Sequence, residues 1–484
     1  MSIFRKKSLS SLLSQLSESG EGTLKRTLDA KNLIALGIGA IIGAGLFVRT
    51  AAAAGEAAGP GVTLSFILAA LGCAFAGLCY AEFAAMIPIA GSAYTYAYCT
   101  MGEFVAWTIG WALVLEYALG AATVSIAWSE YLNNLLGGTI PYEWCHSPLE
   151  VSTTGVSGIM NLPALVILLL LTLLLIKGTE ESATVNAIIV FTKVAIVLLF
   201  IAIGWQFVNP ANHVPYLIPE GTPGHEDFFK HGWGGVVRGA SIVFFAFIGF
   251  DAVSTAAQEA KNPGRDMPIG ILGSLVVCTI LYILFGHVLT GVANWQEFKI
   301  AGKEASVAYA IQKYMAGYGW LATMVTVAIL AGFSSVILVM LLGQSRVFYS
   351  MAKDGLLPKV FAELHPKFRT PYKSNWILFV FVGLFAAFLP GSLAGDLTSI
   401  GTLFAFVLVS AGVWLMRRSD PNAKRPFRTP LVPLVPLLGV IICSGLIISV
   451  DTTTQLTAAG WMLIGFVIYF LYSKSKSKLA TGAE

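Results

Sequence analysis

Long apolar stretches recur along the whole chain, and short polar segments separate them. A helix needs about 20 predominantly apolar residues to cross the hydrocarbon core of a bilayer, and most of these stretches approach or exceed that length. The pattern therefore predicts an all-α membrane protein with 12 transmembrane helices. We number them as spans 1 to 12, and they lie near 31–57, 61–88, 104–136, 162–176, 182–207, 235–259, 267–292, 317–348, 375–389, 397–416, 431–450 and 458–473.

The composition supports this class and excludes others. Hydrophobic residues make up 56% of the chain and charged residues only 12%, whereas a soluble domain carries about 25% charged residues. An ordinary soluble enzyme is therefore excluded, and a net charge of +4 is too small to suggest nucleic-acid binding. Of the six cysteines, only Cys145 lies in a long polar loop. They form neither a disulfide framework nor a zinc-ligand spacing, so no metal is expected.

The distribution of basic residues predicts the orientation of the chain. Cytoplasmic loops of membrane proteins carry an excess of lysine and arginine. Most of the 30 Lys and Arg residues fall on one side when the N-terminus is placed in the cytoplasm. Residues 1–30 are basic and Ser-rich, without the apolar core of a cleaved signal peptide. Both termini are therefore expected to be cytoplasmic.

Two distant segments share one pattern, which indicates an internal repeat. Span 1 contains Gly37-Ile-Gly-Ala-Ile-Ile-Gly-Ala-Gly-Leu-Phe47 and closes with Glu56-Ala-Ala-Gly-Pro60. Span 6 contains Phe244-Phe-Ala-Phe-Ile-Gly-Phe-Asp251 and closes with Glu259-Ala-Lys-Asn-Pro263. The second copy begins five spans after the first, an odd number, so it must cross the membrane in the opposite direction. The expected organisation is an N-terminal segment 1–30, inverted repeats 31–207 and 235–416, spans 11 and 12 within 431–473, and a cytoplasmic tail 474–484.

The glycine-marked weak points in spans 1 and 6 predict broken helices and a binding site. A helix broken at membrane depth frees backbone groups that need polar partners. The freed amides of one half-helix attract an anion and the freed carbonyls of another attract a cation, so an α-amino acid suits both. The alternative is that the glycines only allow close helix packing. The predicted substrate-binding residues at the two breaks are Ile42, Gly43, Ala44, Gly45, Phe245, Ala246, Phe247, Ile248 and Gly249.

Several further motifs occur in order along the chain. They include Ala76-Gly-Leu-Cys-Tyr-Ala-Glu-Phe83 with Pro88, Gly91-Ser-Ala-Tyr94, and Arg346-Val-Phe-Tyr. With the segments around both breaks, they resemble the cationic amino acid transporter family of the amino acid–polyamine–organocation superfamily, from about residue 24 to about residue 430. The resemblance implies the leucine-transporter-type fold, a 5+5 inverted repeat with broken helices 1 and 6, and the cytoplasmic (inner) membrane of a bacterium. It leaves the substrate open, because bacterial relatives include carriers of neutral amino acids.

Lys193 is an ionisable residue in the middle of span 5, too central for its ammonium to reach the interface. A charge at such a depth costs at least about 2.5–3.5 kcal/mol, and residues of this kind are usually functional. The resemblance implies proton coupling, because proton-coupled bacterial permeases carry a lysine here in place of a sodium ion beside the span 1 break. Ser334 and Ser335 of span 8 are expected near it. The alternative is a structural lysine paired with helix-end carbonyls.

Three more carboxylates lie within predicted spans. Asp251 follows the span 6 break, and Glu116 is in the middle of span 3. Either residue could take up a proton or bind a cationic substrate side chain. An acidic residue at the Asp251 position is proton-sensitive in a related bacterial exchanger subfamily, whereas a structural hydrogen bond is equally open for Glu116. Glu82, near the inner end of span 2, is expected to pair with a cation of a loop.

Two phenylalanines bear on gating and selectivity. Phe245 precedes the span 6 break, where relatives place a bulky ring over the substrate, and an apolar lid would exclude water. Core packing is the alternative for this ring. Phe333 of span 8 is expected to line the pocket wall and to leave too little room for a long cationic side chain. It therefore favours substrates of about the size of alanine.

The sequence thus predicts a secondary active transporter that imports L-amino acids by proton-coupled alternating access, with small neutral substrates favoured. A uniporter of arginine or lysine and an amino acid exchanger are the alternatives. A channel would need a symmetric filter or a ring of like charges, and an enzyme would need a nucleophile–base pair or a metal site. The expected partners are the substrate and the bilayer, with no nucleic acid. No cofactor is expected beyond protons as the coupling ion, and an accessory subunit cannot be read from the sequence.

Overall fold

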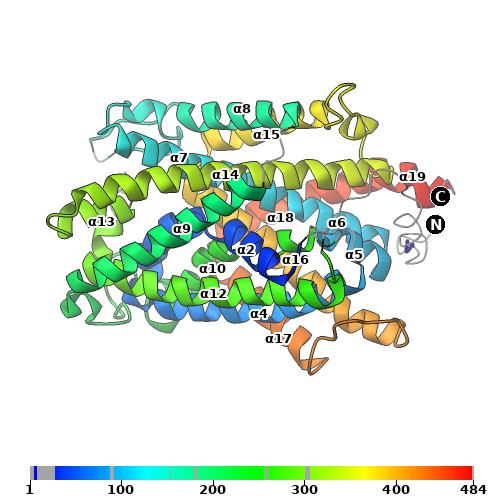
Figure 1. The fold of residues 1–484 in the computed structure, drawn as a ribbon, viewed down its shortest axis with the longest axis horizontal. Helices are drawn as coiled ribbons and strands as arrows, with labels where there is room; N and C mark the ends of the chain where they lie inside the picture. Colours follow the sequence, from blue (N-terminus) through cyan, green and yellow to red (C-terminus); the bar gives the residue numbers. More distant parts are fainter. Residues whose placement is uncertain are drawn as a thin grey trace.

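The computed structural model describes residues 5–7, 28–87, 92–152, 154–178, 183–255, 257, 260–299 and 306–481. Among these residues the regular structure is helical, and β pairing is limited to two isolated bridges, Leu28 with Ala260 and Val151 with Ser157. The helices form an elongated bundle (Figure 1). Within the described ranges, each predicted span coincides with one or more helices. The residues Pro88, Gly91 and Glu259 of the sequence motifs lie outside the described residues.

Nine of the predicted ranges are each occupied by one main helix. These helices are α4 (Val62–Met86), α8 (Leu162–Lys177), α9 (Ala183–Gly204), α12 (Pro263–Val292), α14 (Gly319–Lys353), α15 (Tyr372–Phe388), α16 (Gly391–Ser419), α17 (Leu434–Ile448) and α18 (Thr452–Ile468). Four short helices lie between or after them, and they are α5 (Ser92–Thr100), α13 (Ser306–Tyr314), α19 (Lys474–Lys476) and α20 (Lys478–Thr481).

The other three predicted ranges contain interrupted helices. In span 1, α2 (Ala30–Ile41) stops, and the chain resumes in the π-helical turn η1 (Gly45–Arg49), α3 (Thr50–Ala53) and a second π-helical turn, η2 (Ala54–Ala58). In span 3, a π-helical turn η4 (Leu115–Leu119) joins α6 (Glu103–Val114) to α7 (Gly120–Leu135). In span 6, α10 (Gly232–Phe244) passes into the 3-10 turn η9 (Phe245–Phe247), and α11 (Ala252–Thr255) follows after a gap.

By length and composition, seven helical stretches of the described residues can cross a membrane, and five shorter apolar helices accompany them. The first stretch, Gly45–Met86, covers the second part of predicted span 1 and nearly all of span 2. Gly59 interrupts it with a φ of 57°, a conformation that glycine adopts without strain. Large apolar side chains are exposed on the outer helices, for example Phe191 of α9 at 74%. Such a surface is typical of a multi-pass membrane protein, whose outer face contacts lipid.

Some helices begin or end outside the apolar stretches that predicted them, because polar capping groups determine where a helix starts or stops. The window of span 12 begins at 458, but α18 begins at Thr452 because the Asp451 side chain accepts a hydrogen bond from the Thr454 amide at 2.9 Å. Similarly, α14 continues to Lys353, past the expected end at 348. Hydropathy marks the part of a helix that lies in lipid, whereas the helix itself ends where its backbone groups find other partners.

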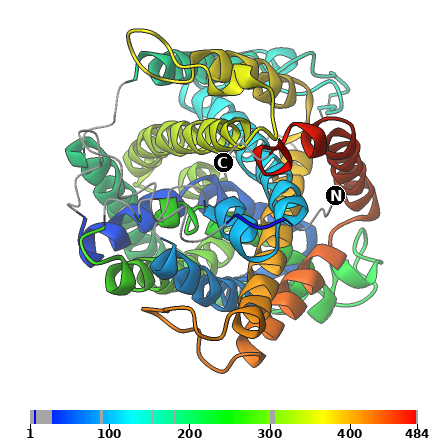
Figure 2. The ribbon, with the colours of Figure 1, turned by 90° about the vertical axis from the view of Figure 1, so that its right-hand side faces the viewer.

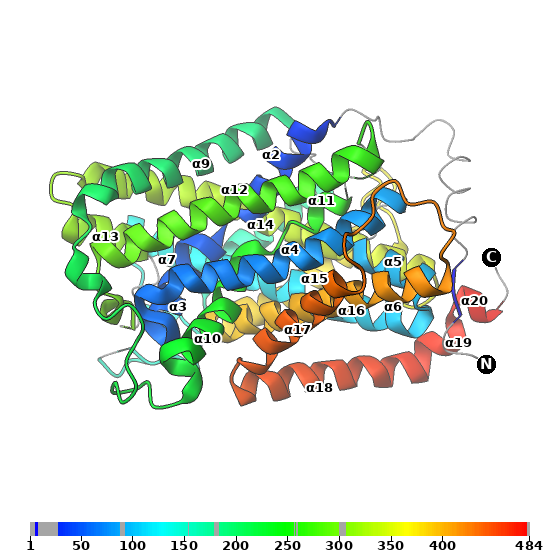
Figure 3. The same ribbon diagram turned by 90° about the horizontal axis from the view of Figure 1, so that it is seen from below.

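Residues 5–7 and the helix α20 lie at the same end of the bundle (Figures 1 and 3). The Glu103 amide donates to the Arg5 carbonyl at 2.8 Å, and the Lys478 amide donates to the Asp354 carbonyl at 3.1 Å. Figure 2 views the bundle from this end. The first half of span 1, α2, packs on α9 and α12 and lies at one edge of the bundle (Figure 3).

Candidate substrate and coupling site

The break in span 1 exposes both kinds of backbone group. Helix α2 ends because Ile42 is extended, with φ −72° and ψ 104°. The outer half then restarts with the Leu46 and Phe47 amides, which donate to the Gly43 carbonyl at 3.1 and 3.4 Å. The amides of Gly43, Ala44 and Gly45 precede these bonds and are the donors that a helix N-terminus leaves without an intrahelical partner. They form the amide cluster that the sequence predicted for an anion.

The break in span 6 lies after the short turn η9. Ile248 is extended, with φ −59° and ψ 134°, and Gly249 has a φ of 112° that favours glycine. The carbonyl of Ala246 is therefore free of its usual helical partner, and Tyr282 of α12 donates to it at 2.9 Å. Phe245, the expected lid residue, begins the turn and is buried beside the break.

The two breaks lie directly against each other. An ideal Cβ on Gly45 would be 2.1 Å from the Cα of Ala246, and one on Gly249 would be 2.9 Å from the carbonyl oxygen of Ala40. Neither position can hold a side chain without separating the two backbones. The nine substrate-binding residues predicted at the two breaks are thus brought into one place. The close approach is what the packing alternative required, and the binding of a substrate at these glycines stays a prediction.

Tyr282 joins the two breaks and was missed by the sequence analysis. Its hydroxyl lies 3.0 Å from the carbonyl of Ile41 and 2.9 Å from that of Ala246. A hydroxyl has a single proton, so the two carbonyls share one donor and keep unused acceptor capacity. The available signal was a tyrosine within the apolar part of span 7, because a buried tyrosine hydroxyl usually needs a polar partner.

Lys193 reaches the first break from α9. Its ammonium donates to the Gly39 carbonyl at 3.0 Å, and the residue is only 3% exposed. Gly332 of α14 makes room for it, since a Cβ there would be 2.7 Å from the Lys193 Cε. The bond uses a backbone carbonyl that the break leaves without its helical partner. A contact of this kind was expected if the lysine is structural, the alternative to a role in proton coupling. The bond also places the charge beside the proposed substrate site.

Phe333 and Phe47 close the space between Lys193 and the break. Their ring centroids lie 6.3 Å apart, and Tyr131 packs edge-on against Phe333 at 5.7 Å. The gap that these rings line together with Gly43 and Lys193 has no room for a water-sized sphere. The site is therefore closed in this conformation, and Phe333 forms part of its wall.

The two serines of α14 differ in their position relative to the gap beside Lys193. The α14 residues that line the gap are Ala328, Ile329, Gly332 and Phe333. Ser334 instead donates to the Leu330 carbonyl of its own helix at 2.9 Å. A helix turns by about 100° per residue, so Ser334 points away from Gly332, whereas Ser335, three residues further on, lies on the same face of α14 as Gly332. A role of either serine beside the lysine stays a prediction.

Glu116 and Asp251 form a second buried site. The Tyr117 hydroxyl donates to Asp251 at 3.3 Å, and Glu116 interacts with the Thr402 hydroxyl of α16 and with the charge of Asp251. Glu116 and Tyr117 lie in the π-helical turn η4, a feature that occurs frequently at functional sites. Apolar periodicity cannot reveal a single extra residue in a helical turn, so the sequence did not predict it. The contact with α16 matches the structural alternative for Glu116.

The comparisons with known proteins agree with this geometry. The family model described as amino acid permease matches residues 28–474. The chain belongs to the amino acid permease family. Its resemblance to cationic amino acid transporters is confirmed, because transporter 9 (chloroplastic) of Arabidopsis thaliana is 37% identical over 92% of this chain and 76% of its own length. The protein is therefore a transporter rather than an enzyme.

Two bacterial relatives cover the permease almost completely. The branched-chain amino acid permease BcaP of Bacillus subtilis is 44% identical, and the match spans 99% of each chain. The methylthioribose transporter of the same organism is 41% identical, again over 99% of each chain. Family membership thus establishes an amino acid permease embedded in a membrane, while the names of the relatives differ in the substrate.

A cluster of charges joins three helices of the permease on one side of the breaks. Asp396 of α16 accepts from Arg49 of η1 and from Arg238 of α10. Arg49 and Asp396 are buried. The sequence analysis gave neither arginine a role. Their ion pairs became visible only when the tertiary structure placed between them a carboxylate that lies 347 positions after Arg49 and 158 positions after Arg238.

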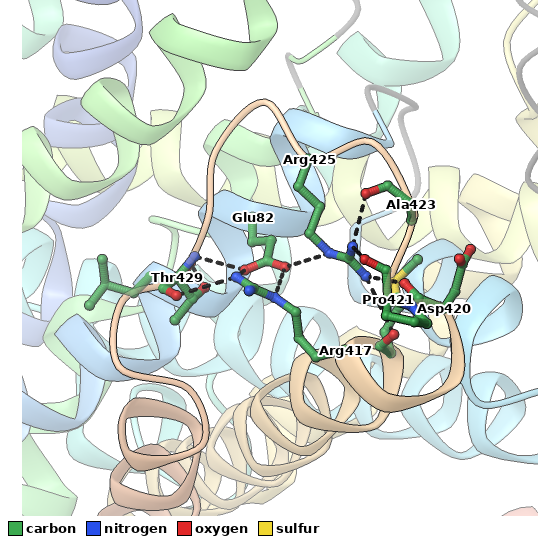
Figure 4. Close-up of polar contacts among 9 residues, drawn as sticks. Glu82, Arg417, Asp420, Pro421, Ala423, Arg425 and Thr429 are labelled. Carbon is green, nitrogen blue, oxygen red and sulfur yellow. Dashed lines mark hydrogen bonds and ion pairs between the residues drawn. The ribbon is translucent and has the colours of Figure 1, made fainter.

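Glu82 has the partners that were expected of it. Its carboxylate accepts two bonds from Arg417 at 2.8 Å, one from the Thr429 amide at 2.7 Å and an ion pair from Arg425 at 3.2 Å (Figure 4). Arg425 also donates to the carbonyls of Asp420 and Ala423. The segment between α16 and α17 is thereby folded over the end of α4, and the predicted pairing with a loop cation is confirmed.

Glu82→Gln is expected to lower the free energy of unfolding by about 3–5 kcal/mol, the usual effect of breaking a buried ion pair from one side. The substitution leaves Arg425 buried without its counter-charge. Denaturation of the purified permease measures the effect. Lys373→Met is the control, because its pair with Glu363 is exposed on both sides and exposed pairs contribute little. Equal stabilities of Glu82→Gln and wild type would show that the cluster does not hold the loop.

Proposed function

We propose that this permease imports neutral L-amino acids across the cytoplasmic (inner) membrane of a bacterium by proton-coupled alternating access. The observation that carries the proposal is the direct contact of two broken helices at Gly45 and Ala246. The substrate carboxylate binds the amides of Gly43, Ala44 and Gly45. The ammonium binds the carbonyls of the segment 245–249, and both interactions follow from the polarity of helix ends.

The proposed substrates have small or branched apolar side chains. Phe47, Phe333 and Tyr131 form an aromatic wall beside the span 1 break, and no acidic side chain lines this gap among the described residues. A wall of this kind favours an apolar group over a guanidinium or ammonium. The relatives named as branched-chain amino acid permeases support the same choice. It extends the alanine-sized substrate suggested by the sequence to somewhat larger apolar ones.

The proposed architecture has twelve spans, a 5+5 inverted repeat and both termini in the cytoplasm. The helices within the twelve predicted ranges and the breaks in spans 1 and 6 support it. The position of residues 5–7 and α20 at the same end of the bundle (Figures 1 and 3) also supports the twelve spans, because an even number of crossings returns the chain to its starting side.

Two polar clusters provide the gates in this proposal. On the outer side, Asp396 joins Arg49 and Arg238, and on the inner side Asp354 accepts from Lys7 at 2.9 Å and from Tyr94 at 2.8 Å. Each cluster connects segments that must separate before substrate can pass. Alternate opening of the two clusters exposes the breaks to one side at a time, and substrate shifts the balance between these states.

Protons are the proposed coupling ion, with Lys193 as the principal site. The ammonium holds the Gly39 carbonyl of α2, and loss of its proton would release that contact. Asp251 and Glu116 are the further proton-coupling candidates, because they lie together behind the span 6 break, where Asp251 accepts from the Tyr117 hydroxyl and Glu116 interacts with the Thr402 hydroxyl. Proton symport distinguishes this proposal from a uniporter of cationic amino acids and from an exchanger.

Recognition of the carboxylate is tested with substrate analogues. We expect free leucine or alanine to compete for uptake, whereas the corresponding methyl esters compete at least about tenfold less, since each lost charged hydrogen bond costs about 1.5–3 kcal/mol. Competition in proteoliposomes measures this. Methylthioribose is the discriminating control, because it carries neither a carboxylate nor an ammonium. Strong competition by methylthioribose, with none by leucine, would favour the activity named for the other relative.

The aromatic wall is tested with Phe333→Ser. We expect the variant to bind arginine or lysine more tightly than wild type does, while alanine still binds, because removal of the ring opens space beside the break. Ligand-induced thermal stabilisation of the purified permease gives the relative affinities. Phe388→Ser on the exposed end of α15 is the matched control. No gain for cationic ligands would show that size at this wall does not determine selectivity.

A further inference from the structure

A second cavity lies away from the breaks, between α6, α16 and α18. Its volume is about 240 Å³, and its inner wall is formed by Ala112, Leu115 and Ile400. At its mouth, Ala459 and Met462 of α18 are accessible from outside. Figure 3 shows α16, α17 and α18 along one side of the bundle. We call this cavity the α18 crevice.

Hydrogen bonds on two sides of the α18 crevice position α18. Towards one end, Trp111 donates to the Trp461 carbonyl at 2.8 Å, Trp461 donates to the Trp111 carbonyl at 3.2 Å, and the two rings stack at 4.6 Å. Towards the other end, the Gln455 amide donates to the Val450 carbonyl at 2.7 Å. The tryptophan pair joins α18 to α6, and the Gln455 bond joins the start of α18 to the segment that precedes it, so both walls of the crevice are held in place.

The chemistry of the crevice selects an apolar occupant. Its lining is apolar apart from Gln455, whose amide nitrogen is already occupied by backbone carbonyls. Apolar cavities stay dry, and one of about 150 Å³ accepts benzene, so this larger crevice can take a segment of hydrocarbon chain. A zwitterionic amino acid would find no partner for its carboxylate there, and burial of an unpaired charge is costly.

The surroundings of the mouth identify the source of that hydrocarbon. Ile448, Leu456 and Leu463 are 63–67% exposed on α17 and α18, as side chains that face lipid tails are. The mouth of the crevice is continuous with this surface. We propose that the α18 crevice binds one acyl chain of a membrane phospholipid, which enters between α16 and α18.

The bound chain would end against the turn that carries Glu116. A Cβ on Gly401 would be 3.0 Å from the Leu115 Cβ and 3.4 Å from the Glu116 amide nitrogen. Leu115 therefore has the crevice on one side and the close contact with α16 on the other. The acyl chain packs against η4 from the lipid side. It fills space that would otherwise lie empty next to the turn that carries the buried Glu116.

Photo-crosslinking in vesicles tests the proposal. The permease is reconstituted in phosphatidylglycerol that contains a fraction of lipid with a diazirine near the end of one acyl chain, and the adducts are mapped by mass spectrometry. We expect adducts on the inner wall, at Ala112, Leu115 or Ile400, which are at most 7% exposed and can be labelled only if the chain enters.

A filling substitution provides the second arm. Ala458→Phe places a ring in the crevice and is expected to reduce the inner-wall adducts severalfold, while adducts on the exposed face of α9 persist. Ala202→Phe, the same change on the lipid-facing side of α9, should leave the inner-wall adducts unchanged. Labelling confined to exposed residues such as Leu463, or inner-wall labelling that Ala458→Phe does not reduce, would overturn the proposal. If Ala458→Phe does not reconstitute, the wild-type adduct map decides by itself.

Discussion

Replacement of Gly45 with alanine is expected to reduce substrate uptake by about 100-fold, the effect of displacing a binding site by about 1 Å. The new Cβ would be 2.1 Å from the Cα and 2.5 Å from the amide nitrogen of Ala246. Both atoms belong to the backbone and cannot rotate away, so the two breaks must move apart. The amides of span 1 and the carbonyls of span 6 would then no longer fit one amino acid. Gly45→Val should be inactive altogether.

Uptake of labelled leucine or alanine into proteoliposomes, normalised to the reconstituted protein, measures this loss. Gly460→Ala is the matched control, because a Cβ there meets nothing within 4 Å. Gly43→Ala should have an intermediate effect, since its Cβ would meet only the end of the Val336 side chain at 3.2 Å. A Gly45→Ala variant that transports as fast as wild type would contradict the placement of the substrate between the breaks.

The second large effect is expected for Lys193→Ala, which should abolish accumulation driven by a pH gradient while exchange of bound substrate persists. The ammonium donates to the Gly39 carbonyl at 3.0 Å, and the variant has no group there to gain or lose a proton. In wild type, uptake should rise as external pH falls and stop with a protonophore. Sodium should be dispensable, because two unit charges at 4 Å repel by about 4 kcal/mol at an effective dielectric constant of 20.

Two glycine variants of α14 test whether coupling depends on the position of the Lys193 ammonium as well as on its presence. Gly332→Ala keeps the lysine but places a Cβ 2.7 Å from its Cε, so it should shift the ammonium from Gly39 and weaken coupling. Gly319→Ala in the same helix meets nothing within 4 Å and should behave as wild type. Accumulation by Lys193→Ala up a proton gradient, or uptake that requires sodium, would show that this lysine is only structural.

Much of the fold was readable along the chain because a bilayer imposes a simple rule on it. Backbone groups in lipid must be satisfied within the helix, so apolar length alone located the helices. The breaks at Gly43 and at Gly249 were also predicted, because glycine and nearby polar residues weaken a helix locally. Lys193, Asp251 and Glu116 were identified for a similar reason, since an ionisable residue inside a span is too costly to be incidental.

The partners of these residues could not be read in the same way. Tyr282 bridges two carbonyls that lie 36 and 241 positions away along the chain, and Asp396 joins arginines from spans 1 and 6. The contact of Gly332 with Lys193 was not predicted either, because helix rotation decides which face of α14 meets the lysine. Hydropathy does not report that rotation when all sides of a helix are apolar.

The sequence by itself determined that this protein is a multi-helix amino acid permease with two interrupted helices and a charged residue beside one of them. The family was read from the resemblance of its motifs, whereas the helices, their interruptions and the charge follow from the local composition and from the cost of leaving polar groups in lipid. Only the tertiary structure decided which atoms meet at the breaks and that the gap beside them is closed. It also decided where the α18 crevice lies. These features depend on the packing of helices that are distant in sequence, and packing is set by shape at close range rather than by the character of any one segment.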